Sequence, residues 1–280
     1  MASTIGRRVG SFLLVLLGLC VLWEGFKWFA ETVDLRIGTF TVNDVTFPHV
    51  YDIVGQLFEP SRRNGPMLIE VLWDSALFTA KEAVAGFLLG AAIGLAIGIV
   101  LHQSQLLLRG FLPYVVASQT VPILAIAPMV VVWLGGELHA PGWVSVAVIA
   151  AYLTFFPVTV NTIRGLDSAD PRALELMRSY AASWWEVLWK LKLPASLPYL
   201  FAAFKVAATA SVVGAIIGEL PSSIQDGLGG AILNFNQYYL SSPESLWATN
   251  LIAALLGISF FLVVVLVERL VVRRAPEHLA

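Results

Sequence analysis

The residues best placed to engage another molecule lie in one charged stretch, residues 164–198, between apolar segments. It carries carboxylates, guanidinium and ammonium groups and three tryptophans, which suit recognition more than bond making. Elsewhere the four histidines lack the spacing of metal ligands. No G-x-x-x-x-G-K-[ST] phosphate loop, H-E-x-x-H or G-x-S-x-G motif occurs. We therefore expect no catalytic residue, metal or cofactor in this chain.

Two short helices with a corner between them are predicted for this stretch. Asp170, followed by proline, has the pattern of an N-cap with proline at the first helical position. Ser183 and Glu186 have the spacing of a capping box, which opens a second helix. We expect that helix to end near Leu193, because Pro194 cannot continue the hydrogen-bond ladder.

The second helix carries an apolar face too large to leave in water. Its members are Trp184, Trp185, Leu188 and Trp189. With Arg172, Arg178 and Lys190 nearby, this face is typical of a docking surface for a partner protein. The alternative is that the tryptophans form an aromatic belt at the membrane interface.

The elements around the charged stretch have the composition of a polytopic membrane protein. Of 280 residues, 58% are hydrophobic and 13% are charged, with a mean hydropathy of +0.79. We predict six transmembrane helices, each long enough to cross a core of roughly 30 Å. They cover about residues 10–29, 76–101, 112–134, 143–163, 199–217 and 248–266. The lone Cys20 excludes a disulfide within the chain and is expected to be a small buried hydrophobe.

Charge sets the predicted orientation. Twelve of the 17 lysines and arginines fall on one side of the six spans, which the positive-inside rule makes cytoplasmic. They are Arg7, Arg8, Arg109, Arg164, Arg172, Arg178, Lys190, Lys192, Lys205, Arg269, Arg273 and Arg274. The prediction is a domain of residues 10–270 with cytoplasmic termini, 1–9 and 271–280. The charged stretch 164–198 is then cytoplasmic, and segments 31–75 and 219–247 are external.

The second predicted span carries a row of small residues. Glycines recur there at every fourth position, which makes a bare ridge for close helix packing; the alternative is that the ridge lines a substrate path. They are Gly86, Gly90, Gly94 and Gly98. Lys81 and Glu82, near the outer end, are expected to reach the interface.

Polar residues in two further spans are the candidates for a translocation pathway. The third span opens with a polar run broken by proline, which survives in lipid only beside protein or a watery cavity. Gln119, Thr120 and Pro122 are the candidates there. The fifth span is rich in small and hydroxyl residues, among them Thr209 and Ser211, which either pack tightly or border a cavity. Glu219, at its outer end, is expected to face water or a partner, because a carboxylate is costly in lipid.

The external segments contain two further features. Residues 48–58 read as a short amphipathic helix, opened by proline, that lies along the outer surface. Asp226-Gly-Leu-Gly-Gly and the cluster Asn234-Phe-Asn-Gln-Tyr-Tyr form either an outer gate or contact with a binding protein, or else an interfacial helix with aromatic anchors.

Three short segments of the charged stretch have a spacing that matches a known motif. They are Glu175-Leu-Met, Ala181-Ala-Ser-Trp and Leu193-Pro-Ala-Ser-Leu-Pro. They resemble the Glu-Ala-Ala loop of inner-membrane permease subunits of ABC importers, with two departures. Leu176 and Met177 replace small alanines, and Ala181 replaces a glycine. If that corner needs positive φ, alanine costs roughly 1–2 kcal/mol, so the turn is either strained or reshaped by the Ser183 cap. The prolines of residues 118–128, followed by Trp133-Leu-Gly, are similar to the nitrate, sulfonate and taurine branch of these permeases.

This resemblance implies a type I ABC importer permease fold with a cytoplasmic coupling helix that inserts into a groove on a separate ABC ATPase, which binds ATP and Mg²⁺. The coupling residues that it implies are Glu175, Arg178, Ala181, Ser183, Trp184, Trp185 and Leu188. It also implies a second permease subunit, identical or closely related, an extracytoplasmic solute-binding protein, and a place among the lipids of a prokaryotic inner membrane. No nucleic-acid partner is expected.

The substrate implied is a small solute. Members of the branch carry nitrate, sulfonates and taurine, and also pyrimidine thiamine precursors or riboflavin. We find no cation deep in the spans to hold an anion, and the cluster at residues 234–239 suits a flat heterocycle, so the sequence favours a vitamin-like molecule. There are two rival functions. An ion-gradient-driven secondary transporter predicts paired ionisable residues at mid-bilayer, and no such pair is visible in the sequences of the third to sixth spans. An intramembrane enzyme requires a nucleophile and base or a metal cluster, and none is visible.

Overall fold

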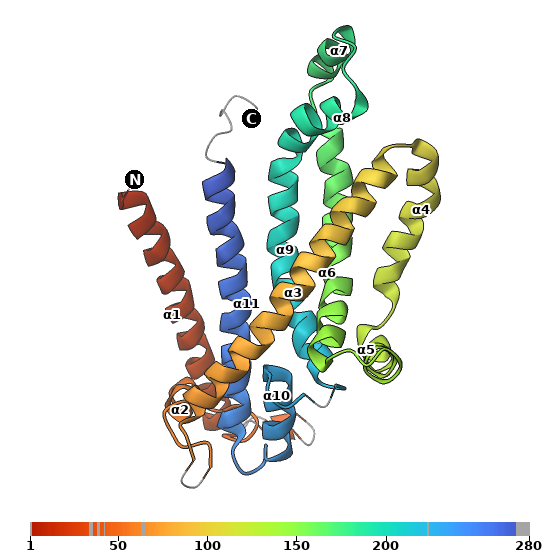
Figure 1. Cartoon of the computed structure of the whole chain (residues 1–280). Helices are drawn as coiled ribbons and strands as arrows, with labels where there is room; N and C mark the ends of the chain where they lie inside the picture. Colours follow the sequence, from red (N-terminus) through yellow and green to blue (C-terminus); the bar gives the residue numbers. More distant parts are fainter. Residues whose placement is uncertain are drawn as a thin grey trace. The chain divides into compact units, whose positions relative to one another are not determined.

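The computed structural model is helical except for one very short hairpin among the residues that it describes, which are 2–33, 36–37, 40–41, 43–62, 65–222 and 224–272 (Figure 1). The helices are α1 (Ala2–Thr32), α2 (Val50–Gln56), α3 (Leu68–His102), α4 (Gln105–Ala117), α5 (Ile123–Val132), α6 (Gly142–Asp167), α7 (Pro171–Ser179), α8 (Trp184–Val187), α9 (Leu193–Glu219), α10 (Leu228–Gln237) and α11 (Pro243–Val272). One 3₁₀ turn, η1 (Ser118–Thr120), and two π-helical turns, η2 (Trp133–Glu137) and η3 (Leu188–Lys192), join them. The hairpin pairs β1 (Arg36–Ile37) antiparallel with β2 (Phe40–Thr41).

The chain divides into two compact units. The first comprises Met1–Trp73 and Ala231–Ile252, and the second comprises Asp74–Gly230 and Ala253–Ala280. The predicted C-terminal segment 271–280, with Arg273 and Arg274, lies outside the described residues from position 273 onward, as does Arg63 of the predicted external segment.

Four helical segments in the described part of the chain are long and apolar enough to cross a membrane. They are α3, α6, α11 and the continuous run Trp184–Glu219. The pair Gln105–Thr120 and Ile123–Glu137 makes a fifth if it counts as one span, although it bends by 93° at its break. The chain is therefore a multi-pass membrane protein.

The expected third span differs most from the structure. The helix already begins at Gln105, so Arg109 lies inside α4 and not in a turn. Pro122 caps α5, as a helix break at this proline predicts, whereas Pro128 lies inside α5 without ending it. Pro128 is tolerated because neighbouring groups can satisfy the freed carbonyl of a membrane helix.

The glycine ridge of α3 packs against α6, as the helix-packing interpretation predicted. A Cβ on Gly86 would overlap Ala150, one on Gly90 would overlap Thr154, and one on Gly98 would lie 2.6 Å from Cβ of Thr162. Two helices approach this closely only where one of them lacks side chains, so the ridge fixes how α3 crosses α6.

α9 packs along α6 through small residues in the second unit (Figure 1). A Cβ on Gly214 would fall 2.7 Å from Cα of Ala150, and Ala207 and Ser211 are fully buried. Of the two alternatives for the fifth span, tight packing is therefore correct for these positions. The same small residues bring the two ends of the charged stretch together, because that stretch joins α6 to α9.

Candidate functional site

The loop between α6 and α9 begins with α7, whose two ends are set by local hydrogen bonds. The Asp170 carboxylate accepts from the N–H of Arg172 at 2.9 Å, which is the predicted cap. At the other end the N–H of Ala182 donates to Met177 at 3.0 Å, and that of Ala181 donates to Arg178 at 2.9 Å. These bonds make a Schellman motif, whose corner residue normally is glycine.

Ala181 occupies that corner with φ of 52°, in the left-handed region. An alanine pays roughly 1–2 kcal/mol there because its Cβ approaches the following carbonyl. Of the two expectations for this turn, the strained one is therefore correct. The Ser183 cap follows the corner and does not remove its positive φ.

α8 opens with the predicted capping box. The N–H of Ser183 donates to Oε2 of Glu186 at 2.9 Å, and the Ser183 hydroxyl accepts from the N–H of Glu186 at 3.4 Å. The predicted end near Leu193 is wrong. The helix passes through η3 into α9, so Pro194 lies in the first turn of α9. A π turn shifts the bonding pattern by one residue, and the missing N–H of proline is tolerated at such a start.

The apolar face is present but has a different membership from the prediction. Trp185 and Trp189 are 63% and 64% exposed, and Trp184 is 41% exposed, with its ring edge-on to Trp185. Leu188, expected on the same face, is 3% exposed, because η3, on which it lies, packs against α6. Leu176 on α7 is 56% exposed and enlarges the apolar surface.

Glu175 and Arg178 lie exposed on α7, the helix that precedes α8 in the loop (Figure 1). Lys190 pairs with Glu186 at 3.0 Å on the surface of α8 and η3. We name the exposed surface formed by Glu175, Leu176, Arg178, Trp184, Trp185 and Trp189 the tryptophan face. An apolar surface rimmed by charges is typical of a protein-protein contact.

A histidine that the sequence did not single out supports the loop. Nε2 of His102, at the end of α3, lies 2.6 Å from Nζ of Lys192 on η3, and its Nδ1 lies 3.4 Å from Asp167 at the end of α6. One ring thus joins three elements beneath the tryptophan face. The contact is long-range, so no local pattern predicts it.

The pathway candidates separate into two groups. Gln119 and Thr120 lie on η1 and Pro122 begins α5, and all three are exposed at the 93° bend. Thr209 is half-buried on α9. Ser211 is fully buried and donates to Ala208 of its own helix, so it lines no surface within this chain.

Two acidic residues, Glu82 within α3 and Glu219 at the end of α9, are not where the sequence predicted. Glu219 does not face water or an open surface, and Glu82 does not reach the interface: both have no exposed side-chain area. Their neighbour Lys81 is exposed, with Nζ 5.4 Å from the centre of the Trp143 ring. The sequence pattern of a helix indicates how deep a residue lies along the span. It does not indicate whether another helix packs over that residue.

Ionisable pairs between helices also occur, although none was visible in the sequence. Lys205 on α9 bonds Glu268 on α11 at 2.9 Å, with each side chain 25% exposed. This pair holds the end of α11 against α9.

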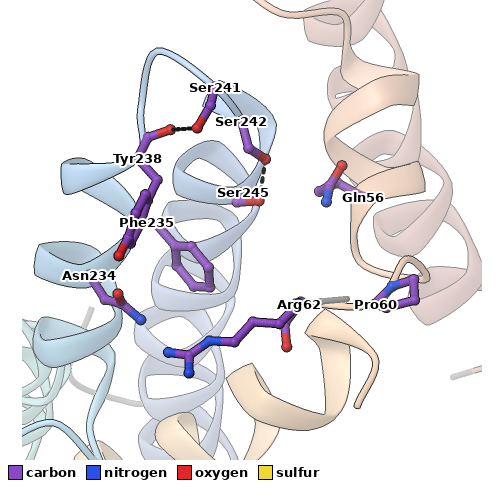
Figure 2. Close-up of a pocket in the computed structure, with 10 residues that line it drawn as sticks. Gln56, Pro60, Arg62, Asn234, Phe235, Tyr238, Ser241, Ser242 and Ser245 are labelled. Atoms are coloured by element: carbon purple, nitrogen blue, oxygen red, sulfur yellow. Dashed lines mark hydrogen bonds between the residues drawn. The ribbon is translucent and has the colours of Figure 1, made fainter. Parts of the chain in front are cut away.

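A cavity of about 550 Å³ lies in the first unit. Part of the predicted amide and aromatic cluster lines it, namely Asn234, Phe235 and Tyr238, together with serines of the following turn. Figure 2 shows Arg62 extending toward Asn234 and Phe235 from the opposite wall. The cavity therefore combines aromatic rings, amide and hydroxyl groups and one guanidinium.

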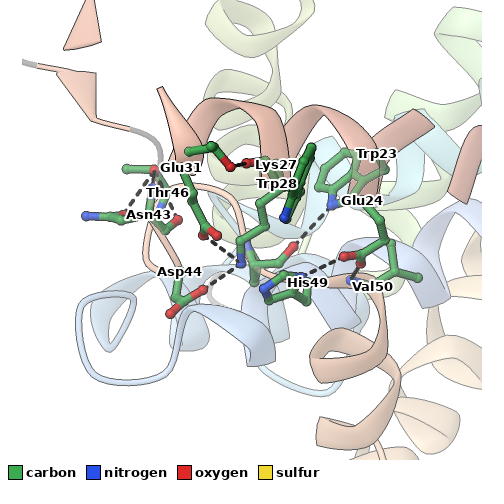
Figure 3. Close-up of polar contacts among 12 residues, drawn as sticks. Trp23, Glu24, Lys27, Trp28, Glu31, Asn43, Asp44, Thr46, His49 and Val50 are labelled. Atoms are coloured by element: carbon green, nitrogen blue, oxygen red, sulfur yellow. Dashed lines mark hydrogen bonds and ion pairs between the residues drawn. The ribbon is translucent and has the colours of Figure 1, made fainter. Parts of the chain in front are cut away.

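The first unit also holds an ion-pair cluster around Lys27 of α1 (Figure 3). Lys27 is fully buried, and its Nζ lies 2.5 Å from Asp44 and 3.8 Å from Glu31. Asp44, Glu31 and His49 have the proximity of metal ligands, but the ammonium group already neutralises these carboxylates. We assign no metal to the cluster.

The short helix predicted within residues 48–58 is present as α2, in the same unit. Glu24 of α1 binds its N-terminus. Its carboxylate accepts from the N–H of Val50 at 2.7 Å and lies 2.6 Å from Nδ1 of His49 (Figure 3). A carboxylate at a helix N-terminus is stabilising, so α1 fixes where α2 begins.

Comparison with known proteins places these features in a family context. Residues 86–275 match the family described as binding-protein-dependent transport system inner membrane component. The chain is 33% identical over 163 residues to the formylaminopyrimidine transport permease protein ThiX of Halalkalibacterium halodurans, which covers 56% of this chain and 63% of ThiX. It is 30% identical over 203 residues to the riboflavin transport system permease protein RibX of Chloroflexus aurantiacus, covering 72% and 73%.

A third relative is the putative aliphatic sulfonates transport permease protein SsuC of Bacillus subtilis, 31% identical over 176 residues that cover 63% of this chain and 61% of SsuC. The matches at 33% identity, which include ThiX, cover 66% and 63% of those relatives, so this chain spans just under two thirds of their length. Among solved structures, an amino acid ABC transporter with histidines aligns with a TM-score of 0.53 at 17% identity, covering 72% of this chain and 94% of that one. This last likeness concerns the fold alone.

Proposed function

We propose, from the premise that this chain belongs to the family of inner membrane components of binding-protein-dependent transport systems, that it is the permease subunit of an ATP-driven importer of a small solute. The observation that carries the proposal is the tryptophan face, which stands exposed on a loop between two membrane helices. In a single chain such a surface is incompletely covered, and a partner protein would bury it.

In this proposal a cytoplasmic ABC ATPase binds the tryptophan face. Trp185 and Trp189 supply rigid apolar area, and Glu175 and Arg178 supply the charged rim. ATP binding and hydrolysis belong to the partner, with Mg²⁺ as its cofactor, and this chain transmits the motion.

Transmission requires a stiff connection. A shift from 1:99 to 99:1 between two states of the pore needs about 5.5 kcal/mol of differential binding, which a loose loop cannot deliver. The continuous helix from Trp184 to Glu219 would carry a displacement of the tryptophan face directly into α9. The contacts of His102 with Lys192 and Asp167 would make α3 and α6 move together with α9.

The assembly that we propose contains two permease subunits, identical or closely related, with six spans each and both termini in the cytoplasm. An extracytoplasmic solute-binding protein would deliver the substrate on the side of segments 31–75 and 219–247. The pathway would include Gln119, Thr120 and Pro122 at the bend of the third span, with Thr209 on α9.

For the substrate we propose a vitamin-like heterocycle in preference to a sulfonate or nitrate. Two supports are the relatives named for formylaminopyrimidine and riboflavin transport. A third is the cavity wall of Phe235, Tyr238 and Asn234, because aromatic rings and an amide suit a flat polar ring. Uptake of a labelled aminopyrimidine, riboflavin and an aliphatic sulfonate into vesicles with the complete importer would distinguish these classes.

The coupling role is tested by replacing Glu175 and Trp185 together with alanine and reconstituting the variant with its ATPase. Loss of a tryptophan anchor typically costs about 2 kcal/mol, so association with the ATPase should weaken by roughly 30-fold. ATP-dependent uptake should fall with it, while membrane insertion remains normal, because both side chains are exposed.

Trp28→Ala is the matched control, since Trp28 is 70% exposed and belongs to α1, which is not part of the loop. It should leave ATPase association unchanged. Wild-type uptake and ATPase binding by the double variant would refute the coupling role. Uptake that depends on an ion gradient without ATP would instead support the secondary-transporter rival, which the family match does not favour.

A further inference from the structure

Two buried carboxyl groups are neighbours in the second unit, because Glu219 bonds Thr79, which lies one helical turn before Glu82 on the same face of α3. Glu82 projects from α3 and Glu219 from the end of α9, and neither has any solvent-exposed side-chain area. A buried carboxylate is costly unless hydrogen bonds or a cation compensate for its lost hydration. The compensation differs between the two residues.

Glu219 is fully bonded. Its Oε1 accepts from the Thr79 hydroxyl at 2.6 Å, and its Oε2 accepts from the N–H of Gly229 at 2.5 Å. The Thr79 oxygen in turn accepts from the N–H of Leu228 at 2.9 Å. Each of these two donors favours the negatively charged form of Glu219 over the neutral one.

The glycine-rich turn at residues 226–230 packs directly against the Glu219 carboxylate. A Cβ on Gly227 would overlap Oε1 of Glu219, and one on Gly229 would lie 2.7 Å from Cβ of Glu219. Both glycines belong to the Asp226-Gly-Leu-Gly-Gly run that the sequence singled out. They let the backbone N–H groups of the turn reach the carboxylate.

Glu82 has the opposite environment. Neither of its oxygens has a hydrogen-bond partner among the described residues. The charged groups that act on it are Glu219 from α9 and Lys81 from α3, and α6 contributes none. Lys81 lies over the ring of Trp143, and it makes no hydrogen bond with Glu82.

A metal ion does not fit this site well. Ca²⁺ takes six to eight oxygen ligands and Mg²⁺ takes six, whereas the Thr79 oxygen is already engaged with Leu228. Of Thr79, Glu82 and Glu219, only the two glutamates have lone pairs to spare. One proton needs only two oxygens, and it removes one of two like charges in a buried place.

We propose that Glu82 and Glu219 form a proton-binding carboxyl pair, in which Glu82 is neutral and donates its O–H to the ionised Glu219. The proton supplies the one hydrogen bond that Glu82 lacks and cancels the repulsion between the two groups. Through Glu219, Thr79 and the N–H groups of Leu228 and Gly229, it fastens the turn at residues 226–230 to α3 and α9. This proton site is independent of the coupling role, because none of its residues belongs to the tryptophan face that would bind the ATPase.

The proposal fixes the direction of a pH effect. Removing the shared proton leaves two buried carboxylates side by side, so stability is present at neutral pH and is lost as the pH rises. Glu82→Gln replaces the O–H donor with an amide N–H donor that does not titrate. The melting temperature of the variant should therefore exceed that of the wild type increasingly toward alkaline pH.

Infrared spectroscopy of the purified chain reads the proton directly. The wild type should show the carbonyl band of a buried neutral carboxylic acid at neutral pH and lose it at alkaline pH. Glu82→Gln should lack one such band, whereas Glu70→Gln, an exposed glutamate on the same helix, should retain it. Both variants should show ATP-dependent transport if the coupling role is correct, so failure of transport and failure of the proton site are separate results.

Three results would overturn the proposal. The first is a wild-type spectrum at neutral pH without a neutral carboxylic acid band, which needs no variant to fold. The second is a band that survives in folded Glu82→Gln. The third is a wild-type melting temperature that rises with sodium or calcium at constant ionic strength, because that result would assign the pair to a metal ion.

Discussion

His102 and Lys192, 90 residues apart in the chain, meet at 2.6 Å between Nε2 and Nζ. The ammonium group donates, so Nε2 accepts and the ring carries its proton on Nδ1, toward Asp167. One neutral imidazole thereby connects α3, α6 and η3 at the base of the coupling loop.

Replacing Lys192 with alanine should loosen the coupling loop more than the same change at Lys190. A hydrogen bond to a charged group contributes about 1.5–3 kcal/mol, whereas an exposed ion pair such as Lys190–Glu186 contributes about 0.3–0.5 kcal/mol. Hydrogen exchange of residues 164–192 should speed up in Lys192→Ala and change little in Lys190→Ala. Equal protection in the two variants would contradict the role given to His102.

Ala181→Gly should stabilise the corner after α7. The left-handed φ of 52° costs alanine about 1 kcal/mol or more, and glycine adopts it without that cost. The variant should melt at a higher temperature than the wild type. Ala182→Gly is the matched control, because Ala182 has no positive φ and should gain nothing from the change. A lower melting temperature for Ala181→Gly would show that the corner is not strained.

Gly90→Ala should destabilise the protein, because the added methyl group would overlap Thr154 and fall 2.6 Å from the carbonyl oxygen of Ala151. Overpacking of this kind typically costs about 1–3 kcal/mol. Gly257→Ala on α11 meets nothing within 4 Å, so it should be neutral or slightly stabilising. Thermal unfolding in detergent measures both; unchanged stability for Gly90→Ala would mean that α3 and α6 are not in close contact.

Acid should weaken the contact between α1 and the segment that follows it. The hydrogen bond from Lys27 lowers the pKa of Asp44. A carboxyl whose folded pKa is depressed contributes stability above its unfolded value, and this is lost as the pH falls through the folded value. Asp44→Asn should therefore melt lower at neutral pH and lose part of the acid dependence.

Tryptophan fluorescence suits this measurement, since Trp23 stacks on Phe47 at 3.8 Å beside the cluster. Asp74→Asn removes an exposed carboxyl outside the cluster and serves as the control. An identical acid profile for Asp44→Asn and the wild type would exclude the ion pair as its cause.

The sequence by itself determined the features that depend on neighbours along the chain. The N-cap at Asp170, the capping box of Ser183 and Glu186 and the break at Pro122 were predictable because backbone hydrogen bonds link residues only a few positions apart. The strain at Ala181 belongs to the same class, since it follows from one residue type at one corner.

Only the tertiary structure decided which distant residues meet. The carboxyl groups of Glu82 and Glu219, the ring of His102 and the ammonium of Lys192 come together because small residues let α3, α6 and α9 approach closely. Helical periodicity gives each residue a depth and a face, but not the partner that the face receives. The burial of Leu188 has the same origin, because η3 packs against the separate helix α6.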